Sequence, residues 1–443
     1  MKVVIMAGGK GTRISSVVSD IPKPMIKIEE IPILEREIEC LKNQGFDDII
    51  ITISHLGNII MNYFGDGSGR SPATGKSFDV HIEYYFENEP LGNAGALFKI
   101  KDKLTSDFLL LNADAVFDVD FNRFVDFHQK HGGLVTLFTH PNSHPYDSGV
   151  IIADKHNTVV KWLAKEDKRP LYYRNRVNAG IHIINPKVLE IVDIDAGSIG
   201  KIGKNGKTVK VDLDRQLLKP LAGTGKMFCY DSPEYVKDMG TPDRYYSVCN
   251  DFKEGRVSGK NLRNKQKAVF LDRDGTINKY VGFLKNINEF ELIDGVATAI
   301  HKINESGYLA IVVTNQPVIA RGEVSFEGLE EIHNKMETLL GREGAYLDAI
   351  YYCPHHPHKG YEGERSELKM NCDCRKPKPG MLLKAAKDFN IDLSQSWMLG
   401  DSENDIKAGA NAGCKTVLFS NKDRNYGQLL TVKTLGEFVD QYL

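Results

Sequence analysis

Residues 268–278 read AVFLDRDGTIN, an apolar run that ends in two aspartates two positions apart, before a glycine and a threonine. The run predicts a buried β-strand with carboxylates at its end. Similar short runs, such as VVIMA (3–7) and FLLLNAD (108–114), alternate with amphipathic stretches along the chain. This rhythm predicts parallel sheets with helices on both faces, in which ligands bind at the carboxyl ends of the strands.

The chain has 443 residues, which is long for one domain and suits two. The two halves carry different motifs, and a polar, glycine-interrupted stretch without apolar periodicity separates them. We therefore expect an α/β protein with two doubly wound, Rossmann-like domains, at 1–245 and 267–443, joined by a linker at 246–266.

Composition excludes several classes of protein. A formal net charge of −2 provides no basic surface for nucleic acid. No apolar run approaches the length of a membrane span. Seven cysteines, an odd number without a signal-peptide pattern, argue against a disulfide framework. We expect a cytoplasmic protein whose partners are small-molecule substrates, with no nucleic acid and no membrane, and the sequence leaves its oligomeric state open.

A glycine-rich turn follows the first apolar run. Its glycines allow backbone N–H groups to approach a polyphosphate, and the arginine that closes it adds a forked positive charge. In isolation, such a turn is equally typical of a plain strand-to-helix connection. The residues concerned are Gly8, Gly9, Gly11, Thr12 and Arg13.

Five further segments favour the phosphate-binding interpretation: SDIPKPM (19–25), EPLGNAGAL (89–97), LLLNADAVFD (109–118), NAGIHII (178–184) and VKDMGTPDRY (236–245). Together they resemble the sugar-1-phosphate nucleotidyltransferases over about the first 245 residues. SVVSDIPKPM (16–25) is most similar to the D-glycero-α-D-manno-heptose 1-phosphate guanylyltransferases. In such enzymes a sugar phosphate attacks the α-phosphorus of a nucleoside triphosphate and expels pyrophosphate.

This resemblance implies roles for the charged residues of the first half. Asp114 and Asp238 would hold Mg²⁺, a hard cation that prefers carboxylate oxygen. Arg13 and Lys23 would be the catalytic cations, which neutralise the triphosphate and fix the reacting phosphates. The glycine-rich turn would bind the same phosphates.

The resemblance also implies contacts with the base and the sugar. Gly92 would let the base approach the backbone of its loop, and Lys165 and Asn178 would bind the sugar phosphate. Many family members have a glutamate directly before that lysine, where this chain has Ala164. The identity of the sugar is therefore less constrained than the type of reaction.

Asp272 and Asp274, with the Gly-Thr that follows, resemble the first motif of the haloacid dehalogenase (HAD) superfamily. Two aspartates at a strand end would by themselves more often be a surface turn. By resemblance, Asp272 attacks phosphorus and forms an aspartyl-phosphate, and Asp274 protonates the leaving oxygen and later deprotonates water.

The remaining HAD motifs follow in the expected order. Thr314 and Asn315 would bind the phosphoryl oxygens, and Lys376 would lie beside the aspartyl-phosphate. Asp401 would join Asp272 and Asp274 as a ligand of Mg²⁺, with Asp405 as an outer helper. The resemblance therefore implies a magnesium-dependent phosphatase.

Two cysteines stand one residue apart in CDCRKPKPGM (372–381), and a Cys-Pro-His triplet lies upstream. Three sulfurs and one imidazole form a closed set that suits structural Zn²⁺. A redox pair is the rival interpretation, but it leaves the upstream triplet unexplained. Zinc would clamp a polar loop and hold the residues after it, Arg375 and Lys376, over the active site. The expected ligands are Cys353, His355, Cys372 and Cys374.

Segments VVTNQ (312–316), IARG (319–322), IYYCPHHP (350–357) and CDCRKPKPGMLL (372–383) resemble the D-glycero-D-manno-heptose 1,7-bisphosphate 7-phosphatases. The resemblance implies that residues 280–283, Arg375 and Lys376 contact the substrate. Pro317 replaces the family's serine, which removes one backbone donor.

We therefore expect a bifunctional enzyme of nucleotide-activated heptose biosynthesis, with Mg²⁺ in both domains and structural Zn²⁺ in the second. It would remove the 7-phosphate from heptose 1,7-bisphosphate and transfer a nucleotidyl group, from GTP by resemblance, to heptose 1-phosphate. The alternative is a hexose 1-phosphate nucleotidyltransferase fused to a histidinol-phosphate-type or other small-ester phosphatase. The nucleobase, the sugar, the anomer and any passage of intermediate between the domains stay open.

Overall fold

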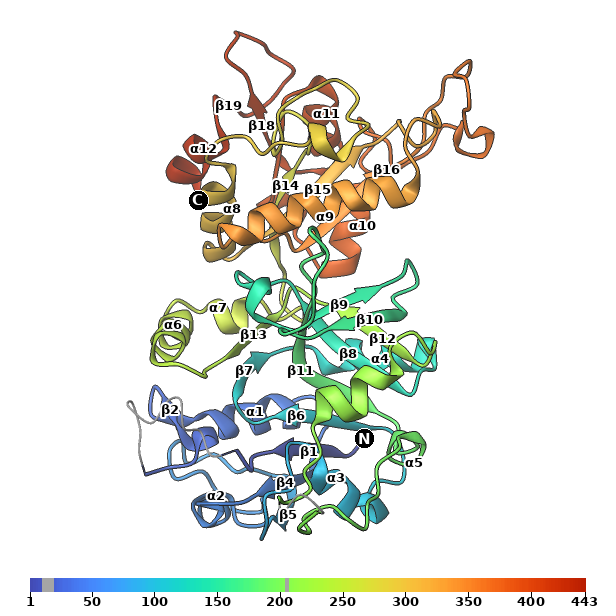
Figure 1. Cartoon of the computed structure of the whole chain (residues 1–443). Coiled ribbons are helices and arrows are strands. Elements are labelled where there is room, and N and C mark those ends of the chain that lie inside the picture. The colour runs from blue at the N-terminus through green and yellow to red at the C-terminus, as the bar shows by residue number, and fades with distance from the viewer. Residues whose placement is uncertain (10–19, 204–206) are drawn as a thin grey trace. The chain divides into compact units, whose positions relative to one another are not determined.

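The computed structural model describes residues 1–9, 20–203 and 207–443, which form two compact units (Figure 1). Each unit has its own sheet and its own apolar core. The first unit comprises Met1–Thr139, Ile151–Trp162 and Asn178–Asn261, and the second comprises His140–Val150, Leu163–Val177 and Leu262–Leu443.

In the described residues the first sheet has nine strands, in the order β10-β9-β11-β6-β1-β4-β5, with β8 beside β11 and β12 beside β8. Strands β6, β1, β4 and β5 run parallel, and β11 pairs antiparallel with β6. The glycine-rich turn therefore begins at the carboxyl end of a central strand. The bounds are β1 (Val3–Met6), β4 (Asp48–Ile53), β5 (His81–Phe86), β6 (Phe108–Asn112), β8 (Val135–His140), β9 (Val150–Ala153), β10 (Val159–Leu163), β11 (Val177–Ile184) and β12 (Met227–Asp231).

Successive residues of β1 pack into opposite cores of the first unit. Val4 belongs to one cluster and Val3 and Ile5 to the other. Because both faces of the sheet are buried at its centre, β1 and β6 are almost continuously apolar and do not alternate with polar residues. Among the described residues, the α-helices that contribute to these two cores are α1 (Ile33–Lys42), α2 (Gly57–Phe64), α3 (Gly95–Lys99), α4 (Phe121–His131) and α5 (Val188–Ile191).

Two small ribbons complete the strands of the first unit: β2 (Lys27–Ile28) with β3 (Ile31–Pro32), and β7 (Ala115–Asp118) with β13 (Tyr235–Asp238). Both pairs are antiparallel. The second ribbon matters for the site, because one of its strands directly follows Asp114 and the other ends at Asp238.

The stretch expected as a linker, 246–266, contains helical structure. The helices α6 (Pro242–Lys253) and α7 (Arg256–Gly259) occupy much of it. The Thr241 side chain caps α6 and Pro242 starts it, which is a regular helix-start signal. Val248 and Val257 are buried in an apolar cluster with residues of β7 and β13, so these helices pack as part of the first unit.

The second unit contains a six-stranded sheet in which every neighbouring pair is parallel, in the order β16-β15-β14-β17-β18-β19. The carboxyl ends of its strands therefore meet at one edge. The bounds are β14 (Lys267–Leu271), β15 (Tyr308–Asn315), β16 (Ala349–Cys353), β17 (Trp397–Gly400), β18 (Lys415–Phe419) and β19 (Leu430–Val432).

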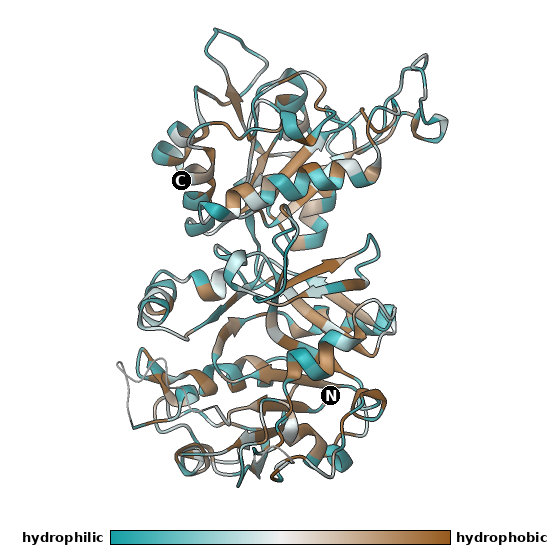
Figure 2. Cartoon of the chain, in the orientation of Figure 1, coloured by the Kyte–Doolittle hydropathy of each residue, from teal (hydrophilic) through white to brown (hydrophobic). Residues whose placement is uncertain are grey.

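Helices cover both faces of this second sheet. One core includes residues of α8 (Val296–Glu305), α9 (Phe326–Arg342) and α12 (Leu435–Tyr442), and the other includes residues of α10 (Gly380–Phe389) and α11 (Glu403–Ala412). Figure 2 shows apolar residues along the strands and hydrophilic residues on the outer faces of these helices. Among the described residues, no helix is long and apolar enough to cross a membrane.

Candidate active sites

A pocket of about 680 Å³ opens at the carboxyl end of β1 in the first unit. Its wall combines the backbone of the glycine-rich turn with charged side chains from other segments. A space of this size with convergent polar groups suits a ligand that has both phosphates and a base. The lining residues include Gly8, Gly9, Lys23, Glu87, Gly92 and Asp114.

Asp114 and Asp238, which are far apart in the sequence, are brought together by backbone pairing, although Asp238 is not among the residues that line the pocket. Asp238 pairs with Ala115 in the β7–β13 ribbon, and the Met239 amide donates to the Asp114 carbonyl at 3.3 Å. The Lys23 ammonium lies 2.9 Å from Asp114 Oδ2. The Asp114 carboxylate and the Lys23 ammonium beside it are groups that suit a magnesium nucleotide, and the share of Asp238 in a magnesium site stays a prediction.

The surroundings of Asp238 favour its ionised form. Burial alone would raise the pKa of this carboxyl group, but the Arg244 guanidinium and the Gly240 amide both donate to it. The net pKa lies below the usual value. An ionised carboxylate is the form that ligates a metal, so Asp238 is prepared for the predicted role.

Three predicted residues of the first half, Gly11, Thr12 and Arg13, lie outside the described residues. Two others, Lys165 and Asn178, do not line the pocket. Lys165 forms an ion pair with Asp147, and Asn178 accepts a hydrogen bond from His182 at 3.0 Å. Their contacts with a sugar phosphate stay predictions.

Gly92 lines the pocket, but its glycine identity has a local cause. Its φ is +83°, and a Cβ on it would lie 2.3 Å from the Val211 carbonyl oxygen. The Val211 amide also donates to the Leu91 carbonyl at 2.8 Å. The glycine is therefore required for close packing of two backbone segments, whatever it contributes to binding a base.

Sequence reasoning missed Glu87, which follows β5 and lines the pocket. A Cβ on Gly8 would lie 2.8 Å from Glu87 Oε1, so the glycine leaves room for this carboxylate. Burial raises the pKa of Glu87, and hydrogen bonds from Leu91 and Thr52 oppose that shift. Only its position after a parallel strand could have singled it out.

In the second unit, Lys376 connects the residues at the strand ends. Its Nζ lies 2.7 Å from Asp272 Oδ1 and 2.6 Å from Asp405 Oδ1, and it donates to the Val313 carbonyl at 2.8 Å. Lys376 is buried, so its charge depends on these carboxylates for compensation. A buried ammonium against a strand-end aspartate is suited to stabilise charge on a phosphoryl group at that aspartate.

Asp272, Asp401 and Asp405 form a compact acidic group, with one oxygen of each within 4.8 Å of the others. Burial raises the pKa of Asp272 to about 7. Burial, together with the negative charge of Asp405, raises the pKa of Asp401 to about 6. Oxygen ligands held this close fit a hard divalent cation. A Cβ on Gly275 would lie 2.3 Å from Asp401 Oδ2, so the glycine of DRDGT admits this carboxylate.

Asp274 was also predicted as a metal ligand, but the compact group contains Asp405 in its place. The Asp274 carboxylate accepts from Arg273 Nη2 at 2.9 Å, from Gln316 Nε2 at 2.9 Å and from Asn278 Nδ2 at 3.1 Å. These donors hold the carboxylate in one orientation, which suits an acid–base group. Its role as a ligand stays a prediction.

Asn315 contacts the backbone of Lys376 in both directions. Its Nδ2 donates to the Lys376 carbonyl at 3.0 Å, and the Lys376 amide donates to its Oδ1 at 3.0 Å. This places Asn315 as a support for Lys376. Thr314 is buried and accepts from Gln316 Nε2 at 3.0 Å, and its contact with a phosphoryl oxygen stays a prediction.

The three cysteines and the histidine of the predicted zinc set converge. The Cys374 Sγ lies 3.3 Å from the Sγ atoms of Cys353 and Cys372 and 3.3 Å from His355 Nδ1. These separations are far longer than an S–S bond and shorter than the edge, about 3.8 Å, of a tetrahedron with a Zn–S bond of about 2.3 Å, so the four side chains are gathered around one point. Arg375 Nη1 donates to the His355 carbonyl at 3.1 Å, which ties the loop to the basic residues after it.

The two sites define two classes of enzyme in one chain: a nucleotidyltransferase in the first half and a HAD-type phosphatase in the second. Family models match accordingly, "Nucleotidyl transferase" over residues 2–255 and "HAD-hydrolase-like" over residues 373–430. The chain belongs to the nucleotidyltransferase family, and its second half belongs to the family of D-glycero-β-D-manno-heptose-1,7-bisphosphate 7-phosphatases.

Individual relatives give the extent of the similarity. The 7-phosphatase of Haemophilus ducreyi is 47% identical over 152 residues, which are 34% of this chain and 81% of that protein. The Escherichia coli K12 enzyme is 44% identical over 157 residues, 35% of this chain and 80% of that protein. The crystal structure of HddC from Yersinia pseudotuberculosis superposes on the chain with a TM-score of 0.45 and 26% sequence identity. The match covers 57% of this chain and 99% of the HddC chain.

Proposed function

We propose that this enzyme catalyses two successive reactions on a heptose. The second half hydrolyses the 7-phosphate of D-glycero-D-manno-heptose 1,7-bisphosphate, and the first half joins the resulting heptose 1-phosphate to a nucleotide from GTP. The observation that carries the proposal is the Asp272–Lys376 pair in a domain similar to bisphosphate 7-phosphatases, in one chain with a nucleotidyltransferase domain. The product of one domain is the substrate class of the other.

The phosphatase reaction uses the strand-end residues in two steps. Asp272 Oδ attacks phosphorus, the bond between phosphorus and the C7 oxygen breaks, and Asp274 donates its proton to that leaving oxygen. Asp274 then removes a proton from water, which attacks the aspartyl-phosphate and releases phosphate. Lys376 stabilises the negative charge in both steps. Mg²⁺, held by Asp272 and Asp401, would supply further charge neutralisation.

The transferase reaction needs no covalent intermediate on the enzyme. An oxygen of the sugar 1-phosphate attacks the α-phosphorus, and the bond to the β-phosphate oxygen breaks as pyrophosphate departs. Lys23 stabilises the charge, and the backbone of Gly8 and Gly9 accommodates the phosphates. Asp114 and Asp238 would hold Mg²⁺, which would supply neutralisation of the charge on the leaving group.

GTP is expected to be preferred over ATP by tenfold or more in kcat/KM, which corresponds to about 1.4 kcal/mol. The Glu87 carboxylate in the pocket can accept from N1–H and the 2-amino group of guanine, whereas adenine offers it an N1 lone pair. The measurement is kcat/KM for GTP, ATP, CTP, UTP and dTTP with one sugar phosphate.

Glu87→Gln should reduce this preference, because an amide cannot accept two hydrogen bonds from guanine in the same way. Glu89→Gln, at another residue that lines the pocket, is the matched control. A wild-type preference for another donor would overturn the guanylyltransferase assignment. A GTP preference that survives Glu87→Gln would assign base recognition to other groups.

We also propose that Cys353, His355, Cys372 and Cys374 bind one structural Zn²⁺. Cys372→Ser/Cys374→Ser is expected to abolish zinc binding and to lower the phosphatase unfolding temperature by about 5 °C or more, because the metal anchors a loop with little core of its own. Elemental analysis and calorimetry measure the two effects. Cys414→Ser, in the same unit but outside the cluster, is the control, and wild-type protein without zinc would refute the assignment.

The proposed substrates can be tested directly by mass spectrometry. The protein is incubated with either anomer of heptose 1,7-bisphosphate and each nucleoside triphosphate, and the sugar nucleotide is identified. Histidinol phosphate is assayed in parallel. If histidinol phosphate is hydrolysed faster than both heptose bisphosphates, the alternative of a small-ester phosphatase is correct.

A further inference from the structure

The loop that follows the catalytic aspartates exposes apolar side chains beside the phosphatase site. Tyr280, Val281 and Phe283 are 69%, 48% and 49% exposed. The loop begins two residues after Asn278, whose side-chain amide donates to Asp274. Exposed apolar residues next to a polar site indicate a surface for a ligand, so this loop, residues 280–283, forms a rim where the sugar part of a substrate would lie.

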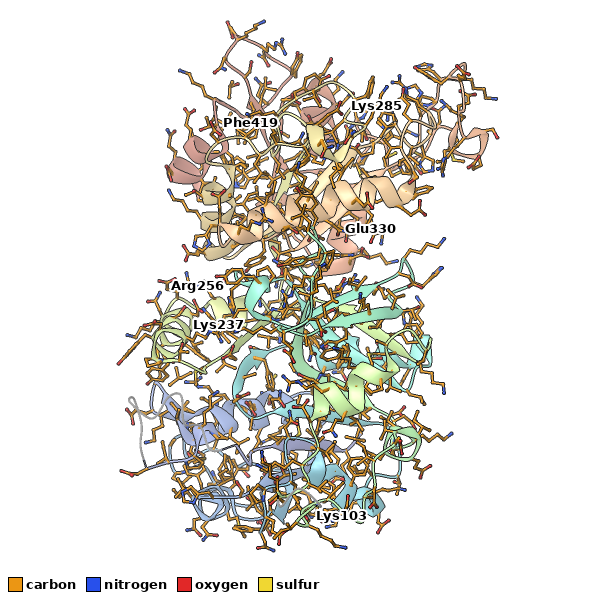
Figure 3. All side chains as sticks on the ribbon, viewed as in Figure 1. Lys103, Lys237, Arg256, Lys285, Glu330 and Phe419 are labelled. Atoms are coloured by element: carbon orange, nitrogen blue, oxygen red, sulfur yellow. The ribbon has the colours of Figure 1, made fainter. Side chains whose placement is uncertain are left out.

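Arg321 is packed between this rim and the zinc-cluster loop. Its guanidinium carbon lies 4.2 Å from the ring centre of Phe283 and 4.3 Å from that of Tyr361. Its Nη2 lies 2.9 Å from Glu323 Oε1, and the same oxygen lies 3.1 Å from Lys285 Nζ, on the residue labelled in Figure 3. One side chain thus contacts both loops through two cation–π pairs.

The backbone around Arg321 is fixed to the loop that carries the cysteines. The Arg365 amide donates to the Ala320 carbonyl at 2.9 Å, and the Ala320 amide donates to the Pro354 carbonyl at 3.2 Å. A Cβ on Gly322 would lie 1.9 Å from the Gly363 carbonyl oxygen, so the backbone segments around these two glycines are in direct contact. Arg321 therefore has little freedom of its own, and Phe283 gains a rigid support.

We propose that Arg321 is a positioning residue of the phosphatase, which holds Phe283 so that residues 280–283 form a fixed surface for the sugar of a phosphorylated substrate. Arg321 acts through Phe283 and does not itself contact the reacting phosphate. The inference rests on the proposed phosphatase function, since it assigns the support of the substrate surface in that site.

The test compares a sugar substrate with a small ester that needs only the phosphoryl site. Arg321→Met is expected to raise KM about tenfold for the sugar bisphosphate that the wild type hydrolyses best, with kcat within about twofold. The kcat/KM for p-nitrophenyl phosphate should not change. Arg321→Lys, which keeps the charge but not the planar group, should resemble Arg321→Met and serves if the latter does not fold.

Double substitution separates positioning from direct binding. In a Phe283→Leu background, Arg321→Met should have no further effect on KM, because the ring that Arg321 holds in place is already absent. Lys384→Met, which removes a cation–π contact with Tyr351 elsewhere in the unit, is the control and should leave KM unchanged.

Each other outcome contradicts a different statement. An Arg321 effect that persists in Phe283→Leu would show direct binding of substrate and overturn the positioning role. An equal loss on p-nitrophenyl phosphate would show a general structural effect and overturn it as well. A wild type that prefers a sugar phosphate other than heptose bisphosphate would contradict the proposed substrate, while the Arg321 comparison proceeds on the preferred sugar.

Discussion

Asp272→Asn is expected to lower the rate of phosphate release from heptose 1,7-bisphosphate by about 10⁴-fold or more, because an amide cannot form the aspartyl-phosphate. Lys376 would also lose a carboxylate that lies 2.7 Å away. Nucleotidyl transfer to purified heptose 1-phosphate should be unchanged, since Asp114 and Asp238 belong to the other unit. Free phosphate and pyrophosphate are measured separately on the same preparation.

Asp440→Asn is a suitable control for this substitution. Asp440 is an exposed aspartate of the same unit that pairs with Lys302 on the surface, and its removal should leave both rates unchanged. Circular dichroism checks that each variant folds. If both activities fell together in folded Asp272→Asn, the assignment of two independent sites would be wrong.

The convergence of the phosphatase residues could be predicted from sequence for a simple physical reason. Asp272, Thr314 and Asp401 each end or directly follow a short apolar run, and parallel strands place such positions at one edge. The sheet order β15-β14-β17 makes these three strands neighbours. Lys376 could be added only through its family motif, because it lies on a loop whose path no periodicity determines.

The details of that loop could not be predicted. The contact of Asn315 with phosphate stays a prediction, but the two hydrogen bonds between its amide and the backbone of Lys376 were not foreseen. This pairing depends on how the loop that carries Cys372 and Cys374 returns to the sheet, which is a tertiary property. The helix α6, by contrast, had a readable start in Thr241 and Pro242, and the polar composition of the stretch after it obscured that signal.

In the transferase site, too, some residues could be predicted from sequence motifs and others depend on tertiary structure. The strand pattern places Asp114 at a strand end, and only the family resemblance pairs it with Asp238. The register of β7 and β13, which sets Asp238 beside Ala115, could not be predicted. Glu87 belongs to no motif and was missed for that reason. Residues with a motif could be found in advance, whereas those defined only by register or by a neighbouring loop could not.

Asp114→Asn and Asp238→Asn are each expected to lower kcat of nucleotidyl transfer by about 10²–10³-fold, because the charge on departing pyrophosphate loses its main stabilisation. The Kd for the sugar phosphate should change little, since the metal acts on the nucleotide. The Mg²⁺ concentration needed for half-maximal rate should rise. Asp238→Asn also removes the ion pair between Asp238 and the Arg244 guanidinium, so this variant should be the more impaired.

Lys23→Ala should differ from both, because Lys23 contributes a fixed charge that does not depend on bound metal. Its ammonium lies 2.9 Å from Asp114 Oδ2 in a buried position, so its removal should lower kcat and also raise KM for the nucleotide. Asp243→Asn, at an exposed carboxylate at the start of α6, should change neither constant. If Asp238→Asn instead weakened sugar phosphate binding with kcat and Mg²⁺ dependence intact, Asp238 would be a sugar ligand, and the magnesium site would have to be built from Asp114 without it.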